Sequence, residues 1–237
     1  MATIEELKKE AAHRAVEQIR SGMVVGLGTG STAVHAVRRL GALLADGTLR
    51  DIVAIPTSEE TAANSRQANI PLTTLDDHPA IDLTIDGADE FDPALNVIKG
   101  LGGALLREKV VAAASARFVI IVDERKQVDR LGTTAPVPVE VIRFAERPVW
   151  EHLERLGATI TRRERPDGEP FITDEGNYIL DARFGPMVDP AGIARAIIDQ
   201  PGVVDHGLFL GMVDEVIMAG MDGIEVFTRP STATDQR

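Results

Sequence analysis

The chain contains no cysteine among its 237 residues. A disulfide framework, a cysteine nucleophile and a thiolate metal site are therefore excluded, and the composition carries no sign of an oxidising compartment. No apolar run reaches the length of about 18 residues that a membrane-spanning helix needs. The first residues, MATIEELKKE, are charged and typical of a helix rather than of a secretory signal. We therefore expect a cytoplasmic protein that does not use the membrane.

Positive charge is also scarce. The 25 Lys and Arg residues are outnumbered by 37 Asp and Glu residues, so that the formal net charge is −12. Because nucleic acids and anionic lipids repel such a chain, neither is an expected partner, and an anionic small ligand needs a local cluster of cations. The five histidines are scattered along the chain, and we predict neither a metal site nor another cofactor.

The first half of the chain alternates between segments of strand length and segments with helical periodicity. Apolar positions from Ile4 to Ile19 predict an amphipathic helix, and Thr3 with Glu6 has the spacing of a capping box. A strand followed by a helix is predicted in MVVGLGTGSTAVHAVRRLGALLADG and again in IVAIP with SEETAANSRQ. IDLTIDGADEFD and FVIIV add strands, and GGALLREKVVAAAS adds a helix. Strands this rich in Val, Ile and Leu favour an α/β fold with a mainly parallel sheet covered by helices on both faces.

The pattern changes near Thr133, where Pro136 and Pro138 mark a crossover to a second unit. Beyond it, a helix ending at Gly157 is followed by two predicted strands, ATITRRER and FITDEGNYILDARF, with a hairpin turn at residues 174–177, and by a helix near residues 191–199. EVIMAG and GIEVFT are expected to return to the main sheet, and PSTATDQR is expected to be a frayed end. We assign residues 1–134 and 207–230 to the main domain, 135–206 to a small α+β subdomain and 231–237 to a tail.

A glycine-rich turn follows the first predicted strand. Residues 26–32 have the sequence GLGTGST, and their amides can converge on an anion at the positive end of the next helix. Ser31 and Thr32 add hydroxyl donors. A dinucleotide fingerprint fails because Ser31 replaces its third glycine, and a nucleoside triphosphate loop fails because no lysine follows the last glycine. The turn favours a monophosphate, although similar glycines also occur in turns that bind nothing.

Two more polar loops are expected at the same edge of the sheet. Asp86 and Asp89 stand at the end of a buried strand, where open α/β sheets gather their ligand-binding loops. Lys99 precedes a glycine turn, and Glu108 lies about one helical turn beyond it. Each loop has a structural alternative, since Asp86 can cap a turn and Glu108 and Lys109 can be ordinary surface charges. Together the three loops predict a phosphate cradle, acids that bind hydroxyls, and a lysine with a glutamate in one pocket.

The chain as a whole resembles type A ribose-5-phosphate isomerases. The resemblance is carried by GLGTGSTA, SEET, DGADE, KGLGGALLREK and DERKQV, then by PVEV, GVVDHGLF and DGIEVF. It implies a three-layer α/β domain with a smaller ferredoxin-like α+β subdomain. It also implies the reversible interconversion of D-ribose 5-phosphate and D-ribulose 5-phosphate through an enediolate, without a metal or other cofactor, in the non-oxidative branch of the pentose phosphate pathway. A homo-oligomer, either a dimer or a tetramer, is expected on the same ground.

The resemblance also implies roles for individual residues. Glu108 matches the base that transfers the proton, Lys99 is assigned to the enediolate oxygens, and Asp86 and Asp89 are assigned to the sugar hydroxyls and to ring opening. The substrate-binding positions are Lys8, Thr29, Gly30, Ser31, Thr32, Asp86, Gly87, Ala88, Asp89, Lys99, Gly100, Leu101, Gly102 and Lys126. Leu101 departs from the family, in which glycine is common, and its side chain can shift the backbone that faces the sugar.

The protonation of Glu108 and the class of function are left open at this point. Burial would raise the pKa of Glu108 towards the working pH, whereas the positive end of a nearby helix favours the charged form by roughly 0.3–1 kcal/mol. Two other functions share the pattern: a sugar-phosphate sensor without turnover, and an acyl-coenzyme A transferase with Glu59, Glu60 or Glu108 as the nucleophile. Exchange of solvent deuterium into the sugar would favour the isomerase, and covalent labelling by an acyl donor would favour the transferase.

Overall fold

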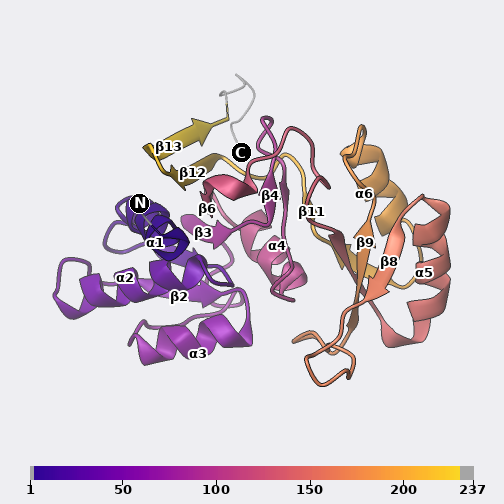
Figure 1. Cartoon of the computed structure of the whole chain (residues 1–237). Coiled ribbons are helices and arrows are strands. Elements are labelled where there is room, and N and C mark those ends of the chain that lie inside the picture. Colours follow the sequence, from indigo (N-terminus) through magenta and orange to yellow (C-terminus); the bar gives the residue numbers. More distant parts are fainter. Residues whose placement is uncertain (1–2, 230–237) are drawn as a thin grey trace.

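The computed structural model describes residues 3–229, and its centre is a twisted sheet of six strands in the order β13-β12-β6-β3-β1-β2 (Figure 1). All neighbouring pairs are parallel except β12 with β13, which are antiparallel. The strands are β1 Val24–Leu27, β2 Val53–Pro56, β3 Leu83–Gly87, β6 Phe118–Asp123, β12 Glu215–Gly220 and β13 Gly223–Thr228. The predicted α/β fold is confirmed, including the return of EVIMAG and GIEVFT to the main sheet.

Helices cover both faces of this sheet, and its strands are apolar throughout for that reason. In β6, Val119 and Ile121 pack into the core below α1 and α2, while Phe118, Ile120 and Val122 pack into the core on the opposite face, which α4 covers. The helices are α1 Ile4–Val16, α2 Ala33–Ala45, α3 Glu59–Gln67 and α4 Leu105–Ala113. The predicted capping box of α1 is present, with Glu6 N donating to Thr3 Oγ1 at 3.3 Å and Thr3 N donating to Glu6 Oε2 at 2.6 Å.

A second sheet of four antiparallel strands lies beside the main sheet, with the order β10-β7-β9-β8 (Figure 1). The elements of this unit are β7 Val137–Val141, the 3₁₀ turn η2 Arg143–Ala145, α5 Glu146–Arg155, β8 Thr159–Arg162, β9 Tyr178–Arg183, α6 Pro190–Ile198 and β10 Val203–His206. Their sequence β-α-β-β-α-β is that of a ferredoxin-like unit, as expected. All of them fall within residues 135–206, while the domain boundaries themselves stay a prediction.

The predicted strand FITDEGNYILDARF is wrong in its first half. Only Tyr178–Arg183 is a strand, and the connection from β8 to β9 is a long loop that contains the predicted turn at residues 174–177. Thr173 Oγ1 and Asn177 Nδ2 both donate to the buried carboxylate of Glu140 at 2.9 Å. These bonds hold the segment against β7, and beyond β8 the pairing continues as an isolated bridge between Glu164 and Pro170. The predicted tail, residues 231–237, lies outside the described residues.

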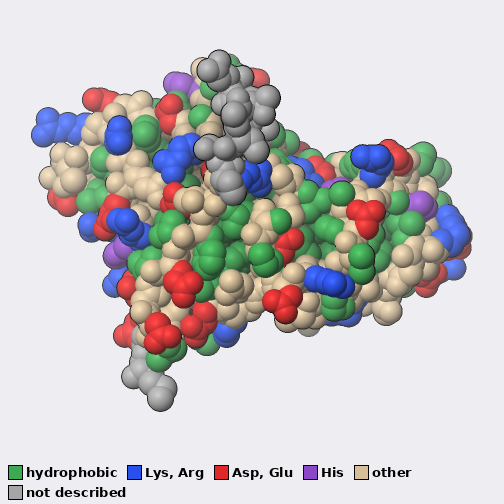
Figure 2. All heavy atoms as spheres, turned by 90° about the horizontal axis from the view of Figure 1, so that it is seen from above, with side chains coloured by type: hydrophobic (Ala, Val, Ile, Leu, Met, Phe, Trp, Pro, Cys, Tyr) green, Lys and Arg blue, Asp and Glu red, His purple; other side chains and the backbone are tan. Residues whose placement is uncertain are grey.

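A small third sheet, which sequence periodicity did not predict, connects the two units. Its strands are β4 Glu90–Phe91, β5 Val97–Ile98 and β11 Leu208–Phe209, in the order β11-β5-β4. The 3₁₀ turn η1 Glu124–Lys126 directly follows β6. Figure 2 shows acidic and basic side chains interspersed over the upper face of the molecule. Within residues 3–229, no helix combines the length and the apolar character needed to cross a bilayer.

Candidate active site

The loops at the carboxyl edge of the parallel strands enclose a cavity of about 280 Å³. The predicted site residues that line it are Lys8, Thr29, Gly30, Ser31, Thr32, Gly87, Ala88, Asp89, Lys99, Gly100, Leu101, Gly102, Glu108 and Lys126. Arg125 also lines the cavity, and sequence reasoning missed it. Asp86 alone among the predicted residues does not form part of the wall. The three polar loops therefore meet in one place.

Lys99 occupies the floor of this cavity and is only 2% exposed. Its Nζ donates to the carbonyl of Gly87 at 2.6 Å and lies 3.0 Å from Asp86 Oδ2 and 3.3 Å from Glu108 Oε1. The three side chains come from different elements, because Asp86 belongs to β3, Lys99 follows β5 and Glu108 lies in the first turns of α4. The fold thus assembles a buried cation between two carboxyl groups.

Burial sets the protonation of Glu108, which is 3% exposed. It raises the pKa of Glu108 to about 8, with Asp86 and Asp89 adding to the rise and Lys99 opposing it. Burial therefore outweighs the attraction of the Lys99 ammonium group. Glu108 Oε2 has no hydrogen-bond partner among the described residues. The alternative that Glu108 is an ordinary surface charge is wrong.

The charge of Lys99 is maintained by its neighbours. Burial acts to lower the pKa of Lys99, but the carboxyl groups of Asp86 and Glu108 outweigh burial, so that the net pKa is raised. Lys99 is therefore expected to carry its positive charge at neutral pH. Within residues 3–229, no group of three His, Asp or Glu side chains is arranged to hold a metal ion. The carboxyl groups at the floor face the ammonium group of Lys99 instead.

Asp86 lies behind the cavity and is fully buried. Its Oδ1 accepts hydrogen bonds from Thr29 N at 3.1 Å and Gly87 N at 2.7 Å, and burial raises its pKa. A Cβ at Gly28 would lie 2.0 Å from Asp86 Oδ1, so this glycine is required for the close approach. Asp86 thereby joins the first glycine turn to Lys99, while its contact with the sugar stays a prediction.

Asp89 and Leu101 form the side wall together. Leu101 N donates to Asp89 Oδ2 at 3.0 Å, and burial raises the pKa of Asp89. Leu101 is not in the left-handed region of backbone space, whereas Gly100 and Gly103 have φ values of +100° and +87°. Leucine is thus accommodated without strain at position 101, and its side chain is 42% exposed. The turn needs glycine at positions 100 and 103.

Cations and hydroxyl groups also line the cavity. Lys8 Nζ donates to Ser31 Oγ at 2.9 Å, and the amino end of α2 begins just beyond Thr32. Arg125 is held by Asp123, with its Nε donating to Oδ1 at 2.7 Å and its Nη2 donating to Oδ2 at 3.1 Å. With Lys126, these groups supply the local positive charge that an acidic chain needs for an anionic ligand.

A buried hydroxyl network supports the first glycine turn. Thr29 Oγ1 lies 2.8 Å from Thr57 Oγ1, 2.8 Å from Ser58 Oγ and 3.1 Å from Thr61 Oγ1. The segment SEET contains Ser58 and Thr61, so this motif positions the turn. The acids between them, Glu59 and Glu60, are exposed and do not line the cavity.

The residues on either side of Glu108 fix α4 to its surroundings. Arg107 pairs with Glu59 at 2.9 Å and with Glu175 at 2.6 Å. Lys109 Nζ donates to Asp205 Oδ1 and to the carbonyl of His206, both at 2.5 Å, and burial lowers the pKa of Lys109. The alternative of Lys109 as an exposed surface charge is wrong. The helix that carries Glu108 is thus tied to the small sheet.

Comparison with known proteins gives the same family from sequence and from structure. Residues 53–223 match the family model described as ribose 5-phosphate isomerase A (phosphoriboisomerase A). The curated ribose-5-phosphate isomerase A of Roseiflexus castenholzii is 54% identical over 217 residues, covering 92% of this chain and 93% of that protein. The one from Desulfatibacillum aliphaticivorans is 54% identical over 224 residues, covering 94% and 97%.

Two solved structures share nearly the whole fold. The ribose 5-phosphate isomerase of Plasmodium falciparum superposes with a TM-score of 0.92 at 43% identity, covering 96% of this chain and 100% of that chain. A D-ribose-5-phosphate isomerase in complex with phospho-erythronic acid superposes with a TM-score of 0.94 at 41% identity, with the same coverage. The matching model, relatives and structures show that this chain belongs to the ribose 5-phosphate isomerase A family.

Proposed function

We propose that this chain catalyses the reversible interconversion of D-ribose 5-phosphate and D-ribulose 5-phosphate. The observation that carries the proposal is the buried Glu108 beside the Lys99 ammonium group, in a cavity that Lys8, Arg125 and Lys126 also line. Family membership supports it, as does the related isomerase that binds phospho-erythronic acid. A phosphorylated sugar suits a cavity that is lined by polar groups and several cations.

Glu108 is the proposed base. It removes the proton from the carbon beside the carbonyl group of the open-chain sugar, and the electron pair moves into an enediolate. The protonated carboxyl group then returns the proton to the neighbouring carbon, and a hydroxyl proton passes from the oxygen of the first carbon to the oxygen of the former carbonyl group, so that the carbonyl group moves by one position. A pKa of about 8 suits this role, because the group can both take and give a proton near neutral pH.

Lys99 is the proposed stabiliser of the enediolate oxygens. It stays charged and lines the cavity next to Glu108, so its field acts where negative charge develops. Asp89 lies in the wall, where it can orient sugar hydroxyls and assist ring opening. Asp86 contributes by holding Lys99 and the first glycine turn in place.

The phosphate group is proposed to bind at Ser31, Thr32, Lys8, Lys126 and Arg125. Contacts at this end do not touch the reacting carbons, but they orient the sugar on the floor of the cavity, so that binding the phosphate lowers the barrier of the proton transfer. A homo-oligomer and a cytoplasmic location stay predictions from the sequence.

Deuterium exchange tests the proposed reaction. In heavy water, the enzyme should convert ribose 5-phosphate to ribulose 5-phosphate and place deuterium on the carbon beside the carbonyl group, as detected by NMR. Binding of ribose 5-phosphate without turnover would identify a sensor and contradict the proposal. Covalent labelling of Glu59, Glu60 or Glu108 by an acyl-coenzyme A donor, without sugar isomerisation, would identify a transferase.

A further inference from the structure

The glycine turn after Lys99 is held from outside by the small sheet. Arg163, the residue that follows β8, donates from Nη1 to the carbonyl of Gly100 at 2.7 Å and to the carbonyl of Leu101 at 3.0 Å. These residues are more than 60 positions apart in the chain, and the contact joins the two units. The turn therefore has one surface that faces the cavity and another that faces Arg163.

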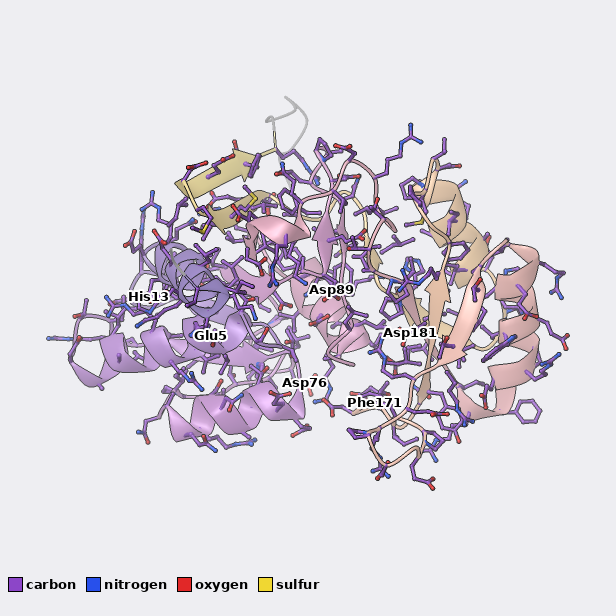
Figure 3. The ribbon with its side chains drawn as sticks, viewed as in Figure 1. Glu5, His13, Asp76, Asp89, Phe171 and Asp181 are labelled. Carbon is purple, nitrogen blue, oxygen red and sulfur yellow. The ribbon has the colours of Figure 1, made fainter. Side chains whose placement is uncertain are left out.

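Asp181 of β9 fixes the guanidinium group from behind. Arg163 Nε donates to Asp181 Oδ2 at 2.9 Å, and Nη2 donates to Oδ1. The side chains of Arg163 and Asp181 are only 12% and 19% exposed. In Figure 3, Asp181 lies on the small sheet and Asp89 on the neighbouring part of the main unit. A bidentate arginine–carboxylate pair fixes the orientation of the guanidinium group. Nη1, the nitrogen that is not bonded to Asp181, is therefore held toward the turn.

A second residue of the same loop supports the other end of the turn. Phe171 N donates to the carbonyl of Arg163 at 2.9 Å, and the Phe171 ring packs against Gly103, where a Cβ would lie 2.3 Å from Phe171 Cζ. The turn thus contacts Arg163 at its start and Phe171 at its end. Figure 3 shows Phe171 on the side of the small unit that faces the main unit.

The position of this turn matters for the site because the surface that faces the cavity adjoins Lys99 and contacts Asp89. Lys99 immediately precedes it, and Leu101 N donates to Asp89. Gly100 and Gly103 lack the restraint that a side chain gives to the backbone, so external contacts add to the bonds within the turn in fixing their conformation. Without Arg163, the carbonyl of Gly100 keeps its bond from Gly103 N at 3.0 Å, and Leu101 loses the guanidinium donor.

We propose that Arg163, fixed by Asp181, is a positioning residue that holds the turn at residues 100–103 and thereby aligns Lys99 and Asp89 for the isomerisation. The inference rests on the proposed function, because the aligned groups are those assigned to the enediolate and the sugar. It gives the small sheet a part in catalysis, although its side chains do not supply the base or the phosphate contacts.

Steady-state kinetics of Arg163→Met, Arg163→Lys and Asp181→Asn test the proposal. The control is Arg162→Met, because the adjacent Arg162 pairs with Glu146 at 3.4 Å and Glu164 at 3.5 Å inside the small unit. Arg163→Met should lower kcat about tenfold or more and change the KM for ribose 5-phosphate less than about threefold, because misplacing groups by about 1 Å can cost about 100-fold in rate. Arg163→Lys should lie between Arg163→Met and wild type, since it keeps the charge but loses the fork.

Several outcomes separate positioning from general stability. Unchanged kcat in Arg163→Met overturns the proposal, and so does an equal loss of kcat in Arg163→Met and Arg162→Met at a matched fraction of folded protein. If Arg163→Met does not fold, Asp181→Asn decides, with a severalfold loss of kcat expected and an unchanged kcat overturning the proposal.

If the wild type lacks isomerase activity, the proposed function fails by itself. Amide hydrogen exchange at residues 100–103 then still tests the contact: faster exchange in Asp181→Asn than in Arg162→Met supports it, and equal exchange overturns it.

Discussion

At the scale of single residues, the chemistry depends on a carboxyl group whose surroundings favour its neutral form. Glu108→Gln keeps the shape of the side chain and removes the basic oxygen. We expect kcat to fall by at least about 100-fold with a much smaller change in KM, which is the span usual for the loss of a general base. The measurement is a coupled isomerase assay, with Glu60→Gln as a control because Glu60 is exposed and outside the cavity. Wild-type turnover in Glu108→Gln would refute the assignment.

The pH dependence of the rate should report the same group. Glu108 is active as a base in its charged form, and the pKa of Glu108 is raised to about 8 by burial. We therefore expect kcat/KM to rise from about pH 6 to about pH 8 and then to level off. A pH–rate profile of wild type measures this rise. A rate that is constant above about pH 5 would mean that the base titrates like an ordinary exposed carboxyl group.

The contribution of Glu108 to the free energy of unfolding should fall as the pH rises, whereas kcat/KM rises. Between the ordinary pKa of 4.5 and the folded-state pKa of about 8, folded Glu108 holds a proton that the unfolded chain has released. The contribution of Glu108 to the free energy of unfolding is therefore kept below pH 4.5 and falls as the pH rises through 8. Glu108→Gln should raise the Tm, relative to wild type, more at pH 9 than at pH 5. An equal difference at both pH values in thermal melts would contradict this.

At the scale of elements, the loop before α2 should control the hold on the phosphate. Ser31→Ala removes a hydroxyl that accepts a bond from Lys8 and lines the cavity. Loss of one such hydrogen bond is worth about 0.5–1.5 kcal/mol, so the KM for ribose 5-phosphate should rise about two- to tenfold while kcat changes little. Inhibition by inorganic phosphate should weaken in parallel. Unchanged KM and phosphate inhibition would show that the cradle lies elsewhere.

The turn before α4 should resist a side chain at Gly103. Gly103→Ala places a Cβ in the left-handed region and within 2.3 Å of the Phe171 ring, whereas Gly168 has φ +84° and nothing within 4 Å of its Cβ. Both alanine variants carry backbone strain of about 1–2 kcal/mol, and only Gly103→Ala adds a steric overlap of about 1–3 kcal/mol. Urea unfolding should show the larger loss for Gly103→Ala. Equal losses of the free energy of unfolding in the two variants would mean that the Phe171 ring moves aside without an energetic penalty.

At the scale of the whole molecule, the sequence predicts most of the architecture because the main-sheet strands are buried on both faces and read as apolar runs. The three polar loops meet as expected, since parallel strands bring their carboxyl ends to one edge. Strands of two residues, such as β4 and β5, are too short for periodicity to reveal. The sequence predicts a strand near Thr173, whereas the structure has a loop there. The bond from Thr173 to Glu140 that holds this loop forms only in the folded chain and leaves no local signal.

The sequence predicts most of the residues that gather at the candidate site, but it does not predict which of them line the cavity and which lie behind its wall. Asp86 and Asp89 look alike in sequence, yet only Asp89 reaches the cavity, because Gly28 allows Asp86 to pack behind the first turn. Arg125 lies beside Lys126 in DERKQV, and this neighbouring cation was the signal that could have found it. The contact of Arg163 with Gly100 has no local signal, because the two residues meet only after both units have folded.

The attachment of α4 has a consequence for how substrate reaches the cavity. Lys109 anchors this helix to β10, and Arg163 anchors the preceding turn to the β8–β9 loop. The small sheet and the reacting groups therefore cannot separate without breaking the Lys109–Asp205 ion pair and the hydrogen bonds from Arg163 to the carbonyls of Gly100 and Leu101. A wide hinge motion between the units would break these contacts beside the site. Sugar phosphates should therefore enter and leave past Leu101, at the edge of the cavity, while the two units keep their positions relative to each other.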